Sequence, residues 1–234
     1  MESIDIWECQ YREHGLKSQR RYPNESFLSF LGKNYADLTM EERHQLKFLE
    51  LGCGSGANLW AVAKEGFQAY GIDSSPTGLD YCRGVLNQWN VNAIIDVGDM
   101  TVLSFQDDFF EVVYDVVSMQ HLTYAQHLSA WSEAFRCLKP EGRFFSFHLG
   151  RNFISPKSKV EMLDPCTVAN VPEGYPLANN GPTCFLVNAV VQRDLTRVGF
   201  IDLKIENIIR SYCAQTIFLE YLVIVGKKGH NADG

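Results

Sequence analysis

Short apolar runs alternate with stretches of helical periodicity through the central part of the chain. Residues 48–60, FLELGCGSGANLW, contain an apolar run with Glu50, a glycine-rich turn and the beginning of a helix-like pattern. Residues 70–75, YGIDSS, contain a second apolar run, which ends in Asp73. Strands that alternate with helices in this way predict an α/β fold with parallel strands.

The alternation continues along the rest of the chain. Lys139-Pro140-Glu141-Gly142 reads as a turn, and a sixth strand is expected to begin at Gly199-Phe200. We expect a third strand over residues 91–97, a fourth strand leading into a helix over 110–122 and a fifth strand over 143–148. A late helix is expected over residues 185–198 and a last strand over 216–225.

Capping residues predict where several helices begin. The signals are Asn24-Glu25 after Pro23, a capping box over residues 39–42, Ser75 before Pro76, and Thr123. A further helix is expected over residues 56–65. After Thr123, apolar residues recur at three- and four-residue steps, which predicts one core-facing side: Leu122, Ala125, Leu128, Trp131, Phe135 and Leu138.

The spacing of the glycines distinguishes between classes of cofactor. Dinucleotide-binding enzymes favour G-x-G-x-x-G, whereas Gly52, Gly54 and Gly56 form G-x-G-x-G with Glu50 two residues before the first. With Asp73 following 21 residues after Gly52, this arrangement resembles motif I of the class I S-adenosylmethionine (SAM)-dependent methyltransferases. The alternative is a glycine turn that only lets a helix pack against the sheet.

The resemblance extends at motif level over residues 45–150 and implies a Rossmann-like, doubly wound, mostly parallel seven-stranded sheet whose last strand inserts antiparallel. In the family, the acid after the second strand binds the ribose hydroxyls, which falls on Asp73. The acid after the third strand meets the adenine amino group, which falls on Asp99. The cofactor-binding residues implied are Arg21, Tyr22, Glu50, Gly52, Cys53, Gly54, Ser55, Gly56, Asp73, Ser74, Asp99, Met100 and Ser118.

Residues 21–25, RYPNE, resemble a stretch of methyltransferases associated with sugar and polysaccharide biosynthesis. In related enzymes an arginine or an aromatic residue of this region meets the methionine carboxylate. For the aromatic residues of the N-terminal segment, including Trp7 and Tyr11, the alternative is a role in packing alone.

Methyl transfer from a sulfonium requires mainly alignment and exclusion of water, but a hydroxyl acceptor with a high pKa also needs a base. His121 follows the fourth strand and His148 ends the fifth, so both are candidate bases. The alternative for His121 is a structural role at the start of the next helix. Tyr124 and Arg151 are candidate substrate-binding residues, Arg151 by gripping a phosphate or carboxylate.

The composition narrows the range of partners. The net charge of −7 and the lack of a basic block disfavour nucleic acid as a partner. Seven cysteines without a C-x-x-C pair indicate neither a disulfide framework nor a zinc site, and no carboxylate-rich set for a catalytic metal is present. The charged N-terminus and the lack of a long apolar run predict a cytoplasmic protein that does not enter a membrane.

The 234 residues fit a single domain. We expect residues 1–45 to form a helical cover over it. Residues 151–183 hold five prolines and are too long for an idle connection, so we expect this insertion after the fifth strand to cap the substrate. A surface excursion without a function is the alternative.

The sequence therefore predicts a SAM-dependent methyltransferase for a small-molecule acceptor, with a hydroxyl of a sugar or a related metabolite as the leading class. N-methylation of a small amine is the alternative reaction. Outside this class stand a dinucleotide-dependent oxidoreductase and a non-catalytic SAM-binding subunit. The sequence leaves the oligomeric state open.

Overall fold

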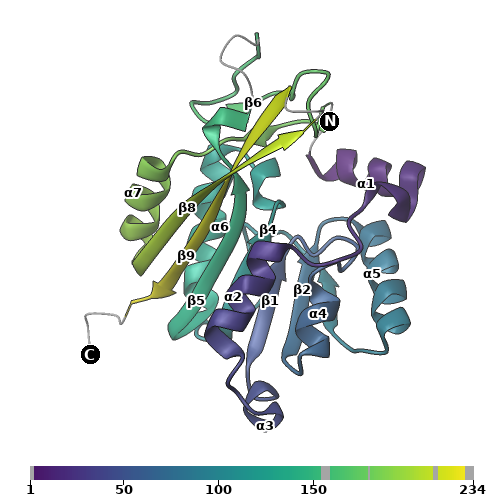
Figure 1. Ribbon diagram of the computed structural model, residues 1–234, viewed down its shortest axis with the longest axis vertical. Helices are drawn as coiled ribbons and strands as arrows, with labels where there is room; N and C mark the ends of the chain where they lie inside the picture. The colour runs from purple at the N-terminus through teal and green to yellow at the C-terminus, as the bar shows by residue number, and fades with distance from the viewer. Residues whose placement is uncertain (1–2, 154–158, 179, 213–215, 230–234) are drawn as a thin grey trace.

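The computed structural model describes residues 3–153, 159–178, 180–212 and 216–229. Its centre is a seven-stranded sheet in the order β3-β2-β1-β4-β5-β9-β8 (Figure 1). β1 to β5 are parallel, and β9 lies antiparallel between β5 and β8, so the predicted Rossmann-like fold is confirmed. The strands are β1 (Lys47–Leu51), β2 (Gln68–Asp73), β3 (Ile94–Val97), β4 (Phe110–Val116), β5 (Leu138–Leu149), β8 (Phe200–Tyr212) and β9 (Ile217–Lys228).

Helices cover both faces of the sheet because β1 and β4 are apolar on both sides. Leu49 belongs to one core cluster with Trp131, and the adjacent Phe48 belongs to the other with Phe27, as the alternation of side chains along a strand requires. The first cluster includes α6 (Tyr124–Cys137) and α7 (Asn188–Val198). The second includes α2 (Glu25–Tyr35), α4 (Leu59–Lys64) and α5 (Pro76–Trp89).

The N-terminal segment forms α1 (Ser3–His14), the 3₁₀ turn η1 (Gly15–Ser18), α2 and α3 (Met40–Arg43). The predicted helix starts are confirmed: Asn24, Thr39, Ser75 and Thr123 each accept a backbone hydrogen bond as N-caps, and Thr39 and Thr123 form complete capping boxes. Figure 1 shows α1 at the same end of the sheet as the insertion that carries β6.

Several predicted boundaries differ from the structure. The glycine turn extends to Asn58, so α4 begins at Leu59 rather than at residue 56. The predicted turn at residues 139–142 is a break in register within β5, with Glu141 at φ 64°. The predicted core-facing side of α6 is confirmed in part. Trp131 and Leu138 are buried and Leu128 and Phe135 pack against the same core, but Ala125 is exposed. The fully buried positions of the helix are His127, Ala130, Trp131, Ala134 and Cys137. Leu122 precedes the helix in extended backbone and also packs against this core.

The insertion after β5 has a small core of its own. Its elements are the 3₁₀ turn η3 (Arg151–Phe153) and the antiparallel pair β6 (Thr167–Val168) and β7 (Thr183–Cys184). Phe153, Val168, Val171 and Phe185 pack together with Leu219 of β9. Residues 154–158 and 179 of this insertion, including Pro156, lie outside the described residues. None of the described helices combines the length and the apolar character needed to cross a membrane.

The central strand gives a direct test of this packing. Leu49 is fully buried in β1, whereas Ile94 on the edge strand β3 is 54% exposed. We expect Leu49→Ala to lower the free energy of unfolding by about 2–5 kcal/mol, because it removes buried methyl groups and leaves a cavity. Ile94→Ala is the matched control and should change it by less than about 0.5 kcal/mol. Equal effects in urea unfolding would contradict the assigned core.

Candidate functional site

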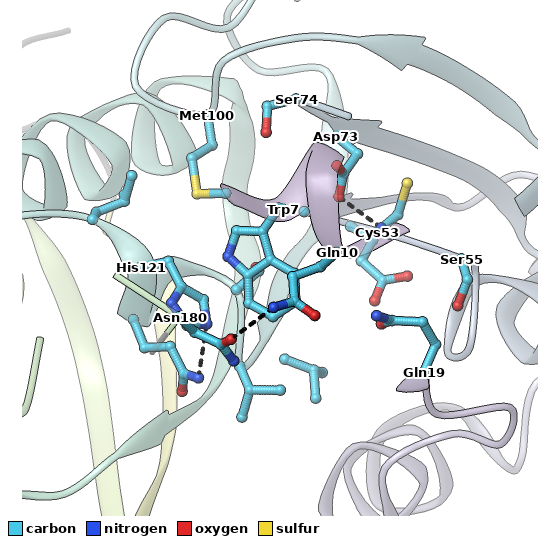
Figure 2. A pocket seen from close by; sticks show the side chains of 18 of the residues that line it. Trp7, Gln10, Gln19, Cys53, Ser55, Asp73, Ser74, Met100, His121 and Asn180 are labelled. Carbon is cyan, nitrogen blue, oxygen red and sulfur yellow. Dashed lines mark hydrogen bonds between the residues drawn. The ribbon is translucent and has the colours of Figure 1, made fainter. Parts of the chain in front are cut away.

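A cavity of about 670 Å³ opens at the carboxyl ends of β1, β2 and β4. Its volume lies within the range of about 300–1,000 Å³ that is usual for small-molecule sites. The walls come from α1, the glycine turn after β1, the ends of β2 and β4, and four residues of the insertion: Pro176, Leu177, Asn180 and Pro182. Figure 2 shows Trp7 near the centre of the view, with Asp73, Cys53 and Ser55 to one side and His121 and Asn180 to the other.

Asp73 is fixed at the end of β2 by the glycine turn. Its Oδ2 accepts a hydrogen bond from Gly54 N at 2.8 Å, and its Oδ1 accepts one from Ser75 N at 2.9 Å. Burial raises the pKa of this carboxyl, and the backbone donors counteract that effect in part. Each oxygen keeps acceptor capacity, so Asp73 can also receive hydroxyl donors from a ligand in the cavity.

The glycine turn is packed too closely to hold side chains at two positions. A Cβ at Gly52 would lie 2.4 Å from Ser118 Cβ, and one at Gly54 would lie 2.3 Å from the Tyr11 hydroxyl. Both residues also have positive φ, of 66° and 51°. Ser118 itself donates to Leu51 O and to Asp115, which holds it against the turn.

Glu50 lies beneath the turn and is 2% exposed. Its carboxylate accepts from Asn58 Nδ2 at 2.6 Å and from the Tyr114 hydroxyl at 3.1 Å. Burial raises the pKa of Glu50 to about 8, although Asn58, Arg20 and Tyr114 favour its charged form. Glu50 therefore supports the turn from below while also contributing to the cavity wall.

Three residues predicted to bind the cofactor, Asp99, Met100 and Ser74, line the cavity. The Oδ1 of Asp99 accepts from the backbone N and the Oγ1 of Thr101, each at 2.8 Å, which fixes the carboxyl on an exposed turn. This turn follows β3 and lies on the Ser74 side of the cavity in Figure 2.

The N-terminal contacts differ from the prediction by one residue. Arg20 and Gln19 line the cavity, but Arg21 and Tyr22 do not. Arg20 Nη2 lies 3.4 Å from Val116 O, whereas the Arg21 carbonyl accepts from Trp60 Nε1 and Tyr22 packs edge-on against Trp89. Alternate residues of an extended segment point to opposite sides, which places Arg20 inward and Arg21 outward.

Gly56 also lies outside the wall, where a Cβ would meet Cys82 Sγ at 2.7 Å. Its role is to let α5 approach the turn closely. Cys53 and Ser55, by contrast, line the cavity.

The two candidate bases occupy different environments. His121, in the 3₁₀ turn η2 (Met119–His121), lines the cavity and packs edge-on against Trp7 with ring centroids 4.7 Å apart. Its Nε2 lies 3.2 Å from Gln120 Nε2. Burial lowers the pKa of His121 to about 4, against a smaller opposite effect of the Pro182 backbone. His121 is therefore neutral at neutral pH.

His148 does not reach the cavity. It is 1% exposed, its Nδ1 lies 2.9 Å from Leu149 O, and its ring packs against His127 at 4.8 Å. The next residue, Leu149, lines the cavity instead. Because neighbouring strand residues point to opposite faces, placing Leu149 in the wall turns His148 into the core.

Neither predicted substrate-binding residue lines the cavity. The Tyr124 hydroxyl donates to Asp194 and accepts from Arg193 Nη2 at 2.6 Å. Arg151 is exposed, and its Nη1 donates to Pro165 O at 2.7 Å. Both side chains hold the insertion and α7 in place rather than facing a ligand.

Several wall residues are not among the predicted site residues. Trp7, Gln10 and Tyr11 come from α1, Asn180 comes from the insertion and Tyr221 from β9. Gln10 Nε2 donates to Asn180 Oδ1 at 3.4 Å, so α1 and the insertion meet at the cavity. The aromatic residues of α1 were the available signal. Among the described side chains, no group of three or more His, Cys, Asp and Glu residues is arranged to hold a metal ion.

Comparisons with known proteins point to one family. The family model described as "Methyltransferase domain" matches residues 48–142. A ubiquinone biosynthesis O-methyltransferase of Coxiella burnetii is 26% identical over 116 residues, which are 50% of this chain and 47% of the relative. The chain thus spans about half the length of the curated relatives it matches.

Two solved structures share the fold over nearly the whole chain. One, described for the conversion of a disulfide bond into a thioacetal group during echinomycin biosynthesis, has a TM-score of 0.70 and 14% identity, covering 99% of this chain and 94% of that one. The other is phosphoethanolamine N-methyltransferase 2 of Haemonchus contortus with phosphomonomethylethanolamine and S-adenosylhomocysteine (SAH). It has a TM-score of 0.69 and 16% identity, covering 98% of this chain and 61% of that one.

The raised pKa of Glu50 predicts a pH dependence of stability. Its ordinary pKa of 4.5 in the unfolded chain rises to about 8 on folding, so between these values the folded protein binds the proton more tightly. The contribution of Glu50 to stability therefore falls as pH rises through this window, by about 1.4 kcal/mol per pH unit at most.

Urea unfolding of the ligand-free protein at pH 5, 6.5 and 8 measures this effect. As pH rises, the free energy of unfolding of wild type should fall relative to that of Glu50→Gln. Glu42→Gln, on the surface, should show no such trend relative to wild type. Parallel stability profiles for wild type and Glu50→Gln would refute the raised pKa.

Proposed function

We propose that the chain is a SAM-dependent methyltransferase that methylates a small-molecule acceptor, with residues 48–142 matching the methyltransferase domain. The predicted family resemblance and the predicted cofactor, SAM, are confirmed by the family match and by methyltransferases among the relatives and structural neighbours. The observation that carries the proposal is the cavity in which Asp73, held by Gly54, faces the same space as His121.

The residues of the cavity fit this cofactor. Asp73 keeps acceptor capacity for the two ribose hydroxyls, and Asp99 and Met100 form a wall for the adenine. Arg20 replaces Arg21 as the cation available for the methionine carboxylate. When bound, SAM supplies a methyl group that its sulfonium has already activated.

The side chains of the chain have two tasks in this reaction. Trp7, Tyr11 and Pro182 narrow the cavity, which favours alignment of the acceptor and exclusion of water. His121 is neutral at neutral pH, so its imidazole can receive the proton that an acceptor hydroxyl loses. The acceptor hydroxyl would take the place of the Gln120 amide at Nε2.

The wall around His121 favours an uncharged acceptor. It presents aromatic and apolar side chains together with the amides of Gln10, Asn180 and Gln120, and Arg20 is its one fixed cation among the described lining residues. Arg151 points away from the cavity, which removes the expected grip on a phosphate. Pro176, Leu177, Asn180 and Pro182 of the insertion complete this wall and support our proposal that the insertion caps the substrate.

Within this class, a hydroxyl of a sugar or a related metabolite stays our proposal. The apolar wall favours a metabolite with a flat apolar face, and the O-methyltransferase of ubiquinone biosynthesis among the relatives supports transfer to oxygen. Transfer to a small amine is the second candidate, since an N-methyltransferase shares the fold. An amine acceptor would make His121 unnecessary as a base.

Asp73→Ala tests the assignment of the cofactor site. Loss of hydrogen bonds to a charged group corresponds to about 1.5–3 kcal/mol, so SAH affinity in calorimetry should fall about tenfold to hundredfold. Asp96→Ala, an exposed acid on the neighbouring strand, is the control and should bind SAH normally. A change of less than twofold in Asp73→Ala would place the ribose elsewhere.

His121→Ala tests the base. Removal of a positioned base should lower the rate of methyl transfer, measured as SAH formed from SAM, by about 10²–10⁴-fold. The acceptor for this assay comes from a metabolite screen, and SAH affinity should stay unchanged. In the wild type the acidic loss of activity should appear near pH 4, because the pKa of His121 is lowered to about 4. His44→Ala, on the surface, should leave the rate unaltered. Near-normal turnover of His121→Ala would favour an amine acceptor or alignment alone.

A further inference from the structure

Helix α1 is attached to the start of α5 by one carboxylate. Glu8 Oε2 accepts from Ser75 Oγ at 2.5 Å and from Thr77 N at 3.2 Å, and Glu8 Oε1 accepts from Thr77 Oγ1 at 2.6 Å. Ser75 is itself the N-cap of α5 and accepts from Gly78 N at 2.9 Å. Glu8 thus reaches from another helix to the positive end of α5, where a carboxylate is favoured.

The charge on Glu8 is well stabilised at this position. Its side chain is 16% exposed, and Arg12 Nε lies 2.8 Å from Oε1. Burial acts to raise the pKa of Glu8, but the hydrogen bonds from Ser75 and Thr77 outweigh it and lower the pKa to about 2. The contact therefore persists across the whole neutral range.

The residues beside Glu8 form part of the cavity wall. Trp7 precedes it and packs on His121, and Tyr11, which is 4% exposed, places its hydroxyl against Gly54. Gln10, on the same helix, bonds to Asn180 of the insertion. The orientation of α1 therefore sets the position of aromatic groups at both the cofactor end and the acceptor end of the cavity.

The described residues of α1 include few buried side chains. Of its residues from Ile6 to His14, Tyr11 is the one that is fully buried, and residues 12–14 are exposed. A helix of 12 residues is marginal in isolation, so its stability comes from tertiary contacts. Helices with few buried contacts open locally more readily than the protein unfolds.

We propose that Glu8 is a positioning residue of the methyl-transfer site, which holds α1 on α5 so that Trp7 and Tyr11 close the cavity over the bound cofactor. This inference rests on the proposed function. It gives Glu8 no contact with the reacting atoms. Glu8 keeps α1 in place over the cavity, so loss of its carboxylate should mainly speed the release of the cofactor.

Glu8→Gln in the full chain is the test, because it keeps the size of the side chain but replaces one acceptor oxygen by a donor. Loss of hydrogen bonds to a charged group should raise the dissociation rate of SAH and the KM for SAM by about tenfold or more. The kcat should fall less, since closure acts on binding. Glu13→Gln, an exposed acid on the same helix, is the matched control and should behave as wild type.

Two further measurements separate positioning from a loss of folding. Amide hydrogen exchange of residues 3–14 should accelerate in Glu8→Gln while the melting temperature stays within a few degrees of wild type. Thr77→Val removes the partner hydroxyl, and its effect on KM should not add to that of Glu8→Gln, because both variants break the same contact.

An unchanged KM and SAH dissociation rate in Glu8→Gln would overturn the inference, as would additive effects of the two substitutions. A lower melting temperature with proportional loss of kcat at constant KM would also overturn it, because that pattern marks a merely structural role. Failure of the wild type to bind SAH would instead refute the proposed function itself.

Discussion

The buried carboxyl group of Glu50 links the cofactor turn to the rest of the fold. It accepts from Asn58 at the end of the glycine turn and from Tyr114 of β4. Asn58 in turn accepts from the backbone N of Asn24, and Asn24 caps α2 by accepting from Phe27 N at 3.1 Å. A buried polar group without partners is costly, so this chain of hydrogen bonds fixes the turn, β4 and the N-terminal cover relative to one another.

A second carboxylate does the same for the acceptor end of the cavity. Asp115 near the end of β4 accepts from Ser118 N at 2.9 Å and from Met119 N at 2.8 Å, and its other oxygen accepts from Ser146 Oγ at 2.9 Å. These bonds fix the start of the 3₁₀ turn that carries His121. The parallel strands thus place three acids, Glu50, Asp73 and Asp115, at one edge of the sheet, and each holds the backbone or a side chain of a neighbouring loop.

The sequence predicts most of the fold because its signals are local. The glycine spacing, the acids that end apolar runs and the capping residues each reflect one turn or one helix end, and the structure has Thr39, Ser75 and Thr123 as N-caps where expected. The wrong assignments depend on which way a side chain points. β5 is buried on both faces, so its pattern shows no alternation that could place Leu149 rather than His148 in the cavity.

The direction of side chains also explains why the sequence did not predict that Arg20 and α1 line the cavity. The segment after the 3₁₀ turn at residues 15–18 is extended, and no hydrophobic alternation indicates that Arg20 rather than Arg21 turns inward. The wall residues of α1 are contributed by a polar helix whose contacts reach residues 67 and more positions away. Such contacts follow from the tertiary arrangement, and the aromatic residues Trp7 and Tyr11 are the one local signal of them.

In the proposed function, cofactor binding and closure of the cavity meet at one residue at the start of α5. Ser75 donates its backbone N–H to Asp73 and its hydroxyl to Glu8. Burial raises the pKa of Asp73, and the charge of Glu8 adds a smaller effect in the same direction. Two carboxylates therefore share the donors at one helix end. A ligand that donates hydroxyl groups to Asp73 stabilises its charged form without requiring Glu8 to leave. In the proposed site, binding of the ribose hydroxyls and attachment of α1 are thus compatible, because the helix end that orients Asp73 also holds Glu8 of α1.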